Sequence, residues 1–409
     1  MPLPSETCLF RARRVLPLSS APIDGGGIAV RGSEILAVGC WEDLVREHPA
    51  AGRRDLGDVI LLPGLINAHC HLDYTMMRNA LSGGGSFTAW IKRLNAIRRS
   101  LDTRDYLDAI SSGLAELRRW GCTTVLNIES FPEVLPLRPE STIRVWWFLE
   151  VMDIRSRLGS EEALAGALGF LGHSGEGRGG FGLSPHAPYT VSPELFELCS
   201  AYSARNRLPL CSHLAESEEE VEMFSKGSGE MHDFLASLGR SMRDCGGTTP
   251  VSAILGKGLL PPGSLLVHMN CLTQSDKELL RSSAGVYPVI HCPRTHAFFQ
   301  RKPFDLEFFR GAGIPVLIGT DSLASNRDLD MFSEMREMAS AFPGLAAREI
   351  LEMASLRPAA AIGRAGLLGE LSPGACADFM AIPDPGNGDP HEQVLANTTP
   401  PAVWVSGHQ

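Results

Sequence analysis

Residues 63–72 read PGLINAHCHL, and residues 316–326 read VLIGTDSLASN. Both are short apolar runs that finish on metal-binding residue types, His69 and His71 in the first and Asp321 in the second. Residues two apart in an extended strand point to the same side, so both imidazoles can reach one ion. Because Pro63 and Gly64 mark a turn before the HxH pair, the pattern favours a strand leading into a site. HxH alone is as typical of two histidines on a solvated loop.

The sequence around these runs alternates apolar, strand-like segments with helical periodicity. We expect strands over residues 60–66, 123–128, 145–149, 180–184, 208–212, 264–268, 286–291 and 315–319, with helices between them, for example at 106–120, 193–205, 217–225 and 328–341. Eight alternations predict an α/β fold, a (β/α)8 TIM barrel spanning residues 61–366. Turn-rich β segments in residues 1–60 and 367–409 predict one small β-sandwich domain built from both termini.

The composition restricts the function classes. The 409 residues are 44% hydrophobic and carry a formal net charge of -10, which argues against nucleic acid as a partner. No run approaches the roughly 20 apolar residues of a membrane helix, and the N-terminus lacks a signal-peptide pattern. Ten scattered cysteines without a CxxC pair are typical of reduced thiols. We therefore expect a cytoplasmic enzyme with a small-molecule substrate.

Chemically useful residues follow the other predicted strands. His213 ends the fifth strand in LCSHLAESEEE and is a third candidate ligand, while Glu216 is placed to carry protons beside a cationic ion. Asp321 completes the ligand set and can accept a proton from bound water. The alternative role for Asp321 is that of a helix N-cap. For residues 218–220 we expect a solvated helix start, which the helix dipole favours.

Further histidines end other strands. They are His186 after the fourth, His268 after the sixth, and His291 and His296 after the seventh. A single histidine of this kind is more often structural. However, seven of the twelve histidines fall at the predicted strand ends, which is where barrel enzymes carry their catalytic residues.

The segments PGLINAHCHL, SPHAPYT, SHLAES and GTDSLASN together resemble the amidohydrolase superfamily, in its cytosine deaminase-like branch with purine-type deaminases and chlorohydrolases. LGELSPGACADFMAI (368–382) resembles the family's return into its β-sandwich. The resemblance implies that His69, His71, His213 and Asp321 hold one divalent ion, Zn or alternatively Fe. It also implies a homodimer. Binuclear relatives carry a lysine on the fourth strand; that strand here has none, which favours a single ion.

The same resemblance implies a reaction. Asp321, with His268 orienting the water, would take a proton during attack on the ring carbon that bears the amino group. Glu216 would protonate the neighbouring ring nitrogen and assist the loss of ammonia. His186 would contact the substrate.

Two departures concern the substrate. Relatives acting on methylthioadenosine and S-adenosylhomocysteine carry a glutamate after the first strand, and SFTAWIKRLNAIRRSL (86–101) has none. HCPRTH (291–296) replaces a more usual HNPxSN, which would put Arg294 and His296 near the substrate. HLDYT and the segment 86–99 resemble more the aminodeoxyfutalosine deaminases of the alternative menaquinone pathway. Arg294 or Arg98 would then pair with the benzoate carboxylate.

Other functions fit the same core residues. A deaminase of guanine or of an adenosine analogue is one, and a chlorohydrolase or amide hydrolase is another. A non-catalytic barrel used for binding would have lost a ligand or the proton carrier, and all are present here.

Overall fold

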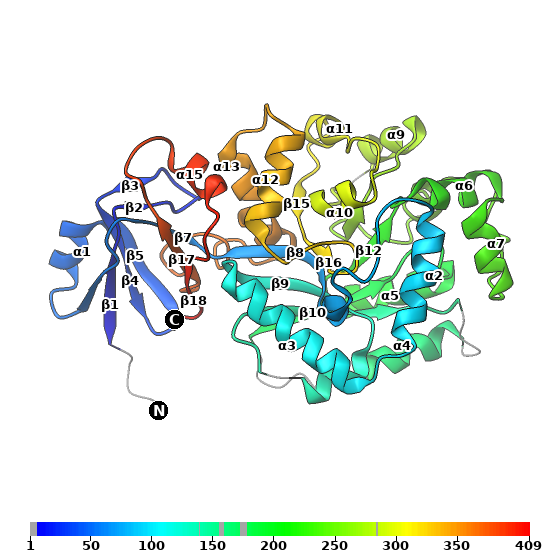
Figure 1. Cartoon of the computed structure of the whole chain (residues 1–409), viewed down its shortest axis with the longest axis horizontal. Coiled ribbons are helices and arrows are strands. Elements are labelled where there is room, and N and C mark those ends of the chain that lie inside the picture. Colours follow the sequence, from blue (N-terminus) through cyan, green and yellow to red (C-terminus); the bar gives the residue numbers. More distant parts are fainter. Residues whose placement is uncertain (1–5, 139, 155–158, 172–177, 284) are drawn as a thin grey trace.

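The computed structural model describes residues 6–138, 140–154, 159–171, 178–283 and 285–409. It shows a large barrel beside a smaller β domain that contains both ends of the chain (Figure 1). The fold class expected from the sequence, a TIM barrel with a β domain built from both termini, is confirmed.

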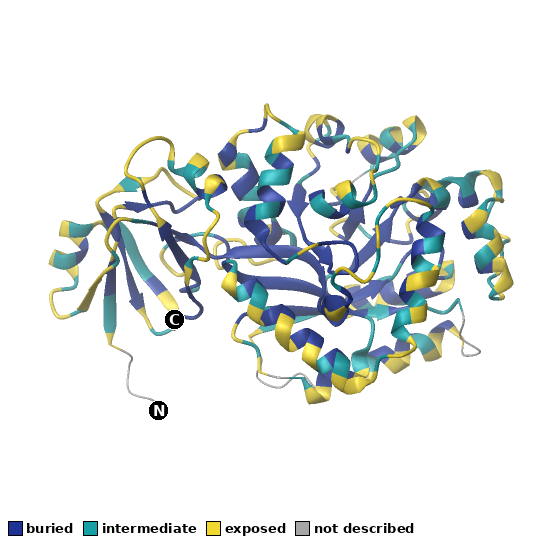
Figure 2. Ribbon diagram, in the orientation of Figure 1, coloured by how far each residue is buried: buried dark blue, intermediate teal, exposed yellow. Residues whose placement is uncertain are grey.

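Parallel strands of the described chain form the barrel. In chain order they are β8 (Leu65–His71), β9 (Cys122–Glu129), β10 (Arg144–Val151), β11 (Gly179–Pro185), β12 (Cys211–Leu214), β13 (Leu265–His268), β14 (Val289–His291) and β15 (Val316–Ile318). Each pairs with its neighbour, and a bridge between Leu183 and Leu210 joins the two halves. The short strand β16 (Asp321–Ser322) pairs with β8 and closes the ring. The strands are buried (Figure 2) and carry the alternating side chains of the core.

The first expected barrel strand is wrong in its extent, because residues 60–66 belong to two strands. β7 (Val59–Pro63) pairs antiparallel with the C-terminal strand β17 (Phe379–Pro383) in the small domain, and β8 starts at Leu65. The residue between them is Gly64, where an added Cβ would lie 2.1 Å from the Thr123 side chain. The chain therefore passes from one domain to the other where only glycine fits against β9.

The small domain contains two sheets, ordered β5-β4-β1-β6 and β18-β17-β7-β2-β3. Their remaining strands are β1 (Thr7–Arg11), β2 (Arg14–Val15), β3 (Ile23–Asp24), β4 (Gly26–Arg31), β5 (Glu34–Cys40), β6 (Gly52–Asp55) and β18 (Ala402–Trp404). Phe10, Phe379 and Trp404 pack as an aromatic core, with Phe379 stacked on Trp404 at 4.9 Å. Apolar residues from both chain ends thus hold the domain together.

Helices surround the barrel (Figure 1). The described helices are α1 (Trp41–Glu47), α2 (Phe87–Arg98), α3 (Thr103–Arg119), α4 (Ser160–Leu168), α5 (Pro193–Asn206), α6 (Glu218–Lys226), α7 (Glu230–Ser237), α8 (Pro250–Ile254), α9 (Gln274–Ser282), α10 (Pro293–Phe298), α11 (Leu306–Gly311), α12 (Met331–Ala341), α13 (Ala347–Met353), α14 (Leu356–Ala361) and α15 (Pro390–Ala396), with 3-10 turns η1 (Leu72–Met77) and η2 (Pro132–Leu137).

Helix α3 shows how the sequence sets these elements. Asp102 caps it in a capping box, and Tyr106, Ile110, Leu114 and Leu117 form its buried face at helical spacing. Among the described helices, none is long and apolar enough to cross a membrane.

Candidate active site

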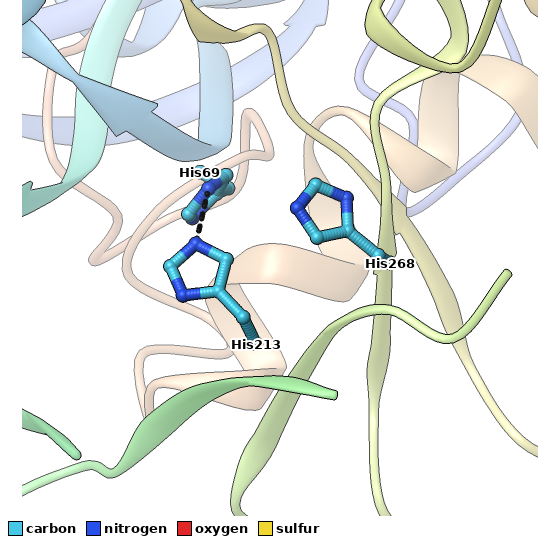
Figure 3. A group of neighbouring side chains, drawn as sticks. All are labelled: His69, His213 and His268. Carbon is cyan, nitrogen blue, oxygen red and sulfur yellow. Dashed lines mark hydrogen bonds between the residues drawn. The ribbon is translucent and has the colours of Figure 1, made fainter. Parts of the chain in front are cut away.

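Three imidazoles and one carboxylate converge at the C-terminal end of the barrel. His69 and His71 come from β8, His213 from β12 and Asp321 from β16. The Nε2 atom of His213 lies 3.3 Å from that of His69 (Figure 3). It lies 3.4 Å from the Nε2 atom of His71. Asp321 Oδ1 lies 3.7 Å and 3.9 Å from the same two nitrogens of His69 and His71. The structure brings together all four residues expected to bind a metal.

The convergence depends on how the barrel closes. Asn67 donates to the Thr320 hydroxyl at 2.7 Å and accepts from the Thr320 amide at 3.1 Å, which fixes the last strand against the first. At Gly319 an added Cβ would lie 2.8 Å from the His69 amide nitrogen. The glycine of GTD therefore allows the backbone carrying Asp321 to approach the HxH strand.

The surroundings of these imidazoles leave their Nε2 atoms available to bind a cation. His213 Nδ1 faces the His186 carbonyl at 3.1 Å, and a carbonyl only accepts, so Nδ1 carries the proton and Nε2 presents its lone pair. The Nδ1 atoms of His69 and His71 are buried and have no hydrogen-bond partner among the described residues. Burial and the charge of His69 lower the pKa of His213 to about 3. Imidazole nitrogens that converge on one point suit a divalent ion.

Backbone strain is concentrated at this end of the barrel. Ala215, His268 and Asp321 adopt positive φ values of 50°, 77° and 58°. A side chain makes this left-handed region unfavourable, and such outliers cluster at functional sites because the surrounding fold must enforce them. The backbone after β12, at the end of β13 and at the start of β16 is therefore strained where it directs side chains toward the site.

Glu216 and His268 lie next to the four converging residues. The Glu216 Oε1 atom is 3.7 Å from His268 Nε2, and both side chains are almost completely buried. Burial raises the pKa of Glu216 well above its usual range, although Arg301 acts in the opposite direction. Burial and nearby His213 lower the pKa of His268. A carboxyl group with a raised pKa beside an imidazole with a lowered pKa is suited to acid–base chemistry.

Two of the three glutamates at positions 218–220 differ from the expectation of a solvated helix start. Glu220 is buried and accepts from the amides of Ala215 and Glu216, so it braces the turn that carries Glu216. Glu219 accepts from the amides of Phe87 and Thr88 at the start of α2. Only Glu218 behaves as expected, exposed and paired with Lys302.

A cavity of about 240 Å³ opens above these residues. Its floor contains His71, His213, Glu216, His268 and Asp321, and its walls include Tyr74, Phe87, Trp90, Ile91, Leu94, Arg98, Glu150, Met152, His186, Tyr189, Phe234 and Phe299. One wall is therefore largely aromatic and aliphatic. His186 and Arg98, two of the four expected substrate contacts, line this cavity.

Arg294 and His296, the other two expected contacts, do not line the cavity. Arg294 Nη1 pairs with Asp328 Oδ1 at 2.5 Å, and its amide donates to Glu334. His296 Nδ1 lies 3.1 Å from Asn270 Oδ1, and its Nε2 faces the Lys302 carbonyl. Both side chains thus have partners within the protein, and their predicted contact with the substrate stays a prediction.

Several buried acidic residues were not predicted. Asp73 follows β8, Glu129 ends β9 and Glu150 lies near the end of β10; all are close enough to Arg98 or to one another to shift their pKa values. Burial raises the pKa of Asp73 to about 7, although Arg98 lowers it. Acidic residues at the ends of two consecutive apolar strands were the signal that could have found this group.

Comparison with known proteins places the chain among metal-dependent hydrolases of one family. Residues 60–409 match the model of the family described as "Amidohydrolase family". An aminodeoxyfutalosine deaminase of Deinococcus radiodurans is 31% identical over 343 residues, covering 80% of this chain and 79% of that protein. A 5-methylthioadenosine/S-adenosylhomocysteine deaminase of Syntrophobacter fumaroxidans is 29% identical over 388 residues, covering 88% and 80%.

Solved structures share the fold. The aminofutalosine deaminase of Helicobacter pylori, in complex with methylthio-coformycin, superposes with a TM-score of 0.86 at 21% identity and covers 98% of both chains. An adenosine deaminase of Xanthomonas campestris with bound zinc gives a TM-score of 0.81 at 23% identity, covering 100% of this chain and 93% of the other. At these identities the likeness supports the architecture.

Proposed function

The chain belongs to the amidohydrolase family and is an aminohydrolase within it, and we propose that it releases the exocyclic amine of a purine nucleoside as ammonia. The observation that carries this proposal is the convergence of His69, His71, His213 and Asp321 beside Glu216, a buried carboxyl group whose pKa is raised by burial. The names of relatives at about 30% identity are 5-methylthioadenosine/S-adenosylhomocysteine deaminase and aminodeoxyfutalosine deaminase.

We propose that His69, His71, His213 and Asp321 hold one divalent ion, zinc in the first instance and iron as the alternative. Three imidazole nitrogens and one carboxylate suit both metals. When bound, the ion lowers the pKa of its water toward neutrality. The described end of β11 carries His186 and no lysine, so the chain offers no bridging lysine for a second ion there.

The remaining steps belong to the side chains around the donor set. Asp321 accepts the proton of the attacking water, and His268 orients that water through its ring nitrogen. Glu216 donates a proton to the ring nitrogen beside the carbon under attack, because its buried carboxyl holds a proton more readily than an exposed one. Asp321 then gives the proton it took from the water to the departing amine, and Glu216 takes up the proton of the newly added hydroxyl group as the C–N bond breaks. Ammonia therefore leaves, a carbonyl remains and both carboxyl groups return to their starting state.

For the substrate we propose a nucleoside with a bulky 5′ substituent, specifically aminodeoxyfutalosine. The aromatic wall with Phe87, Trp90 and Phe299 suits the flat apolar part of that substituent. Arg98 is the only Lys or Arg side chain lining the described cavity, and its fork can pair with the benzoate carboxylate. A neutral 5′-methylthio group would use the same wall but offer no charge to Arg98, which would keep its interactions with the protein carboxylates Asp73 and Glu150.

An ultraviolet assay tests the reaction and the substrate together. The zinc-loaded protein is incubated with aminodeoxyfutalosine, methylthioadenosine, S-adenosylhomocysteine, adenosine and guanine, and ammonia is measured in parallel. We expect loss of the adenine absorbance, with the largest kcat/KM on aminodeoxyfutalosine. Faster turnover of methylthioadenosine would reject aminodeoxyfutalosine as the specific substrate. If none of the compounds released ammonia, the deaminase proposal would be rejected.

A pair of variants tests the role of Arg98. Arg98→Met should raise the KM for the carboxylated substrate by about 10- to 100-fold, the value of one charge-assisted hydrogen bond. The KM for methylthioadenosine should change little. Arg98→Lys keeps the charge and is the matched control, so partial recovery is expected. Equal effects on both substrates would show that Arg98 has another role.

The cellular setting is also a proposal. We propose a cytoplasmic location because all ten cysteines are free thiols. We also propose a homodimer, which sedimentation equilibrium would test.

A further inference from the structure

Arg301 lies directly behind the proton carrier. It follows α10, and its guanidinium lies over the rings of Phe87 and Phe299 at 5.0 Å and 4.9 Å. Both phenylalanines line the cavity, whereas Arg301 does not. Its side chain is 12% exposed, and its Nη2 atom has no hydrogen-bond partner among the described residues. A permanently charged group is thus held away from water with one donor unused.

The carboxylate nearest to that donor belongs to Glu216. Arg301 Nη2 lies 3.9 Å from Glu216 Oε1, which is an ion pair and too long for a hydrogen bond. Placing an arginine in a desolvated position is expensive unless a carboxylate faces it. The position therefore indicates a pairing that the fold maintains.

The neighbouring carboxylates already have donors of their own. Glu218 pairs with Lys302, Glu219 accepts from the first amides of α2, and Glu220 accepts from the amides of the turn before α6. Within residues 216–220, this leaves the side chain of Glu216 as the carboxylate available to Arg301. The division of partners gives Arg301 a specific relation to the residue that we assign to proton transfer.

We propose that Arg301 is a positioning residue for Glu216. It attracts the carboxylate toward the end of the cavity and stabilises the negative charge that appears when Glu216 gives its proton to the substrate. An arginine remains charged at every pH of interest, so Arg301 cannot supply the proton itself. The 3.9 Å separation leaves room for the two groups to come closer when substrate is bound.

The aromatic rings extend this role to the substrate. Phe87 and Phe299 line the cavity, and the Arg301 guanidinium lies over both rings. A substrate that packs on these rings therefore also restricts the position of the guanidinium behind them. The rings exclude water from the ion pair, which strengthens its attraction. Binding of a substrate group to the Phe87 and Phe299 rings therefore helps Arg301 to position Glu216 for proton transfer.

The inference rests on the proposed function, and a double-mutant cycle tests it. Arg301→Gln should lower kcat by about 10- to 100-fold, the cost of a misplaced catalytic group, with KM within about threefold of the wild-type value. Arg301→Lys should recover part of kcat because it keeps the charge. In a Glu216→Gln background, Arg301→Gln should cause no further loss, because a positioning residue acts only through its target.

Arg281→Gln is the matched control. Arg281 also lies over a phenylalanine ring, that of Phe308 at 5.0 Å, but on the exposed surface away from the cavity. Its kcat and metal content should equal those of the wild type, and the metal content of the Arg301 variants should be unchanged as well. If Arg301→Gln does not fold, the double-mutant cycle with Glu216→Gln is measured with Arg301→Lys instead.

The results separate this inference from the proposed function. Wild-type activity in Arg301→Gln, or losses that multiply in the double variant, would overturn the role of Arg301 while Glu216→Gln stays inactive. If Glu216→Gln retained full activity, the proposed function itself would be wrong.

Discussion

Replacing Glu216 by glutamine isolates proton transfer from metal binding and folding. Glutamine has the same shape but cannot carry the proton, and general acid–base catalysis contributes about 10²- to 10⁴-fold. That range corresponds to about 2.7–5.5 kcal/mol of activation free energy. The Glu216 carboxylate accepts none of the backbone hydrogen bonds that hold its own turn; Glu220 accepts those. We therefore expect the loss to appear in kcat with little structural change.

The stability of this variant has a predictable pH dependence. Burial raises the pKa of Glu216 in the folded state, so ionisation at neutral pH opposes folding. A neutral glutamine removes that opposition but also leaves Arg301 without its carboxylate, so the definite prediction concerns pH: the Tm of Glu216→Gln relative to the wild-type Tm should increase as the pH rises from the ordinary pKa of a glutamate toward the folded-state pKa. The assay measures kcat, KM, Tm and zinc content together. A kcat within threefold of wild type would refute the reasoning, as would loss of zinc, since Glu216 is outside the donor set. Glu218→Gln, on the exposed surface, is the control.

Three further variants test the donor set and the scaffold. His213→Ala should weaken zinc affinity by more than the roughly 10- to 100-fold that loss of an outer partner costs, so that elemental analysis after dialysis finds little bound zinc; full zinc occupancy would contradict the assignment. Asn67→Leu should lower the free energy of unfolding, measured in urea, by about 1–3 kcal/mol, because it removes two buried hydrogen bonds to Thr320, whose amide and hydroxyl keep the His69 and Asp321 carbonyls as partners; an unchanged midpoint would contradict this role of Asn67. Arg14 lowers the pKa of Asp384 although burial opposes it, so the pair stabilises the fold above the ordinary pKa of 3.8 and loses that effect as the pH falls through the lower folded-state value. The stability difference between wild type and Asp384→Asn should therefore be constant near neutrality and shrink in strong acid, as measured by denaturation at several pH values.

The positions of the barrel strands could be predicted because parallel strands are buried on both faces. Such strands are continuous apolar runs bounded by turn residues, and the chemistry follows each run directly. The boundary at Pro63 could not be predicted in the same way. β7 and β8 are both apolar and adjacent, so the sequence forms one uninterrupted run, and only their different pairing partners separate them.

The metal-type residues could be predicted because short side chains on strands have little choice of direction. His69 and His71 share one face of β8 by the two-residue period, and Asp321 is delivered by the strand beside it. Glu219 and Glu220 show where this reasoning ends. They occupy a first helical turn, where acidic residues are favoured for local reasons, yet their actual partners are the start of α2 and the turn before α6.

Long cationic side chains are the least predictable part of the site, and the reason is energetic. A guanidinium at the edge of a cavity can turn toward the ligand or toward the protein, and desolvation favours whichever side already holds a carboxylate. Asp328 lies where Arg294 can reach it, so Arg294 turns away from the cavity. Glu216 lies where Arg301 can reach it, so Arg301 stays behind the cavity wall. The sequence gives the position of each arginine along the chain, but the carboxylate that captures it comes from a distant segment or another turn, and only the assembled barrel decides the pairing.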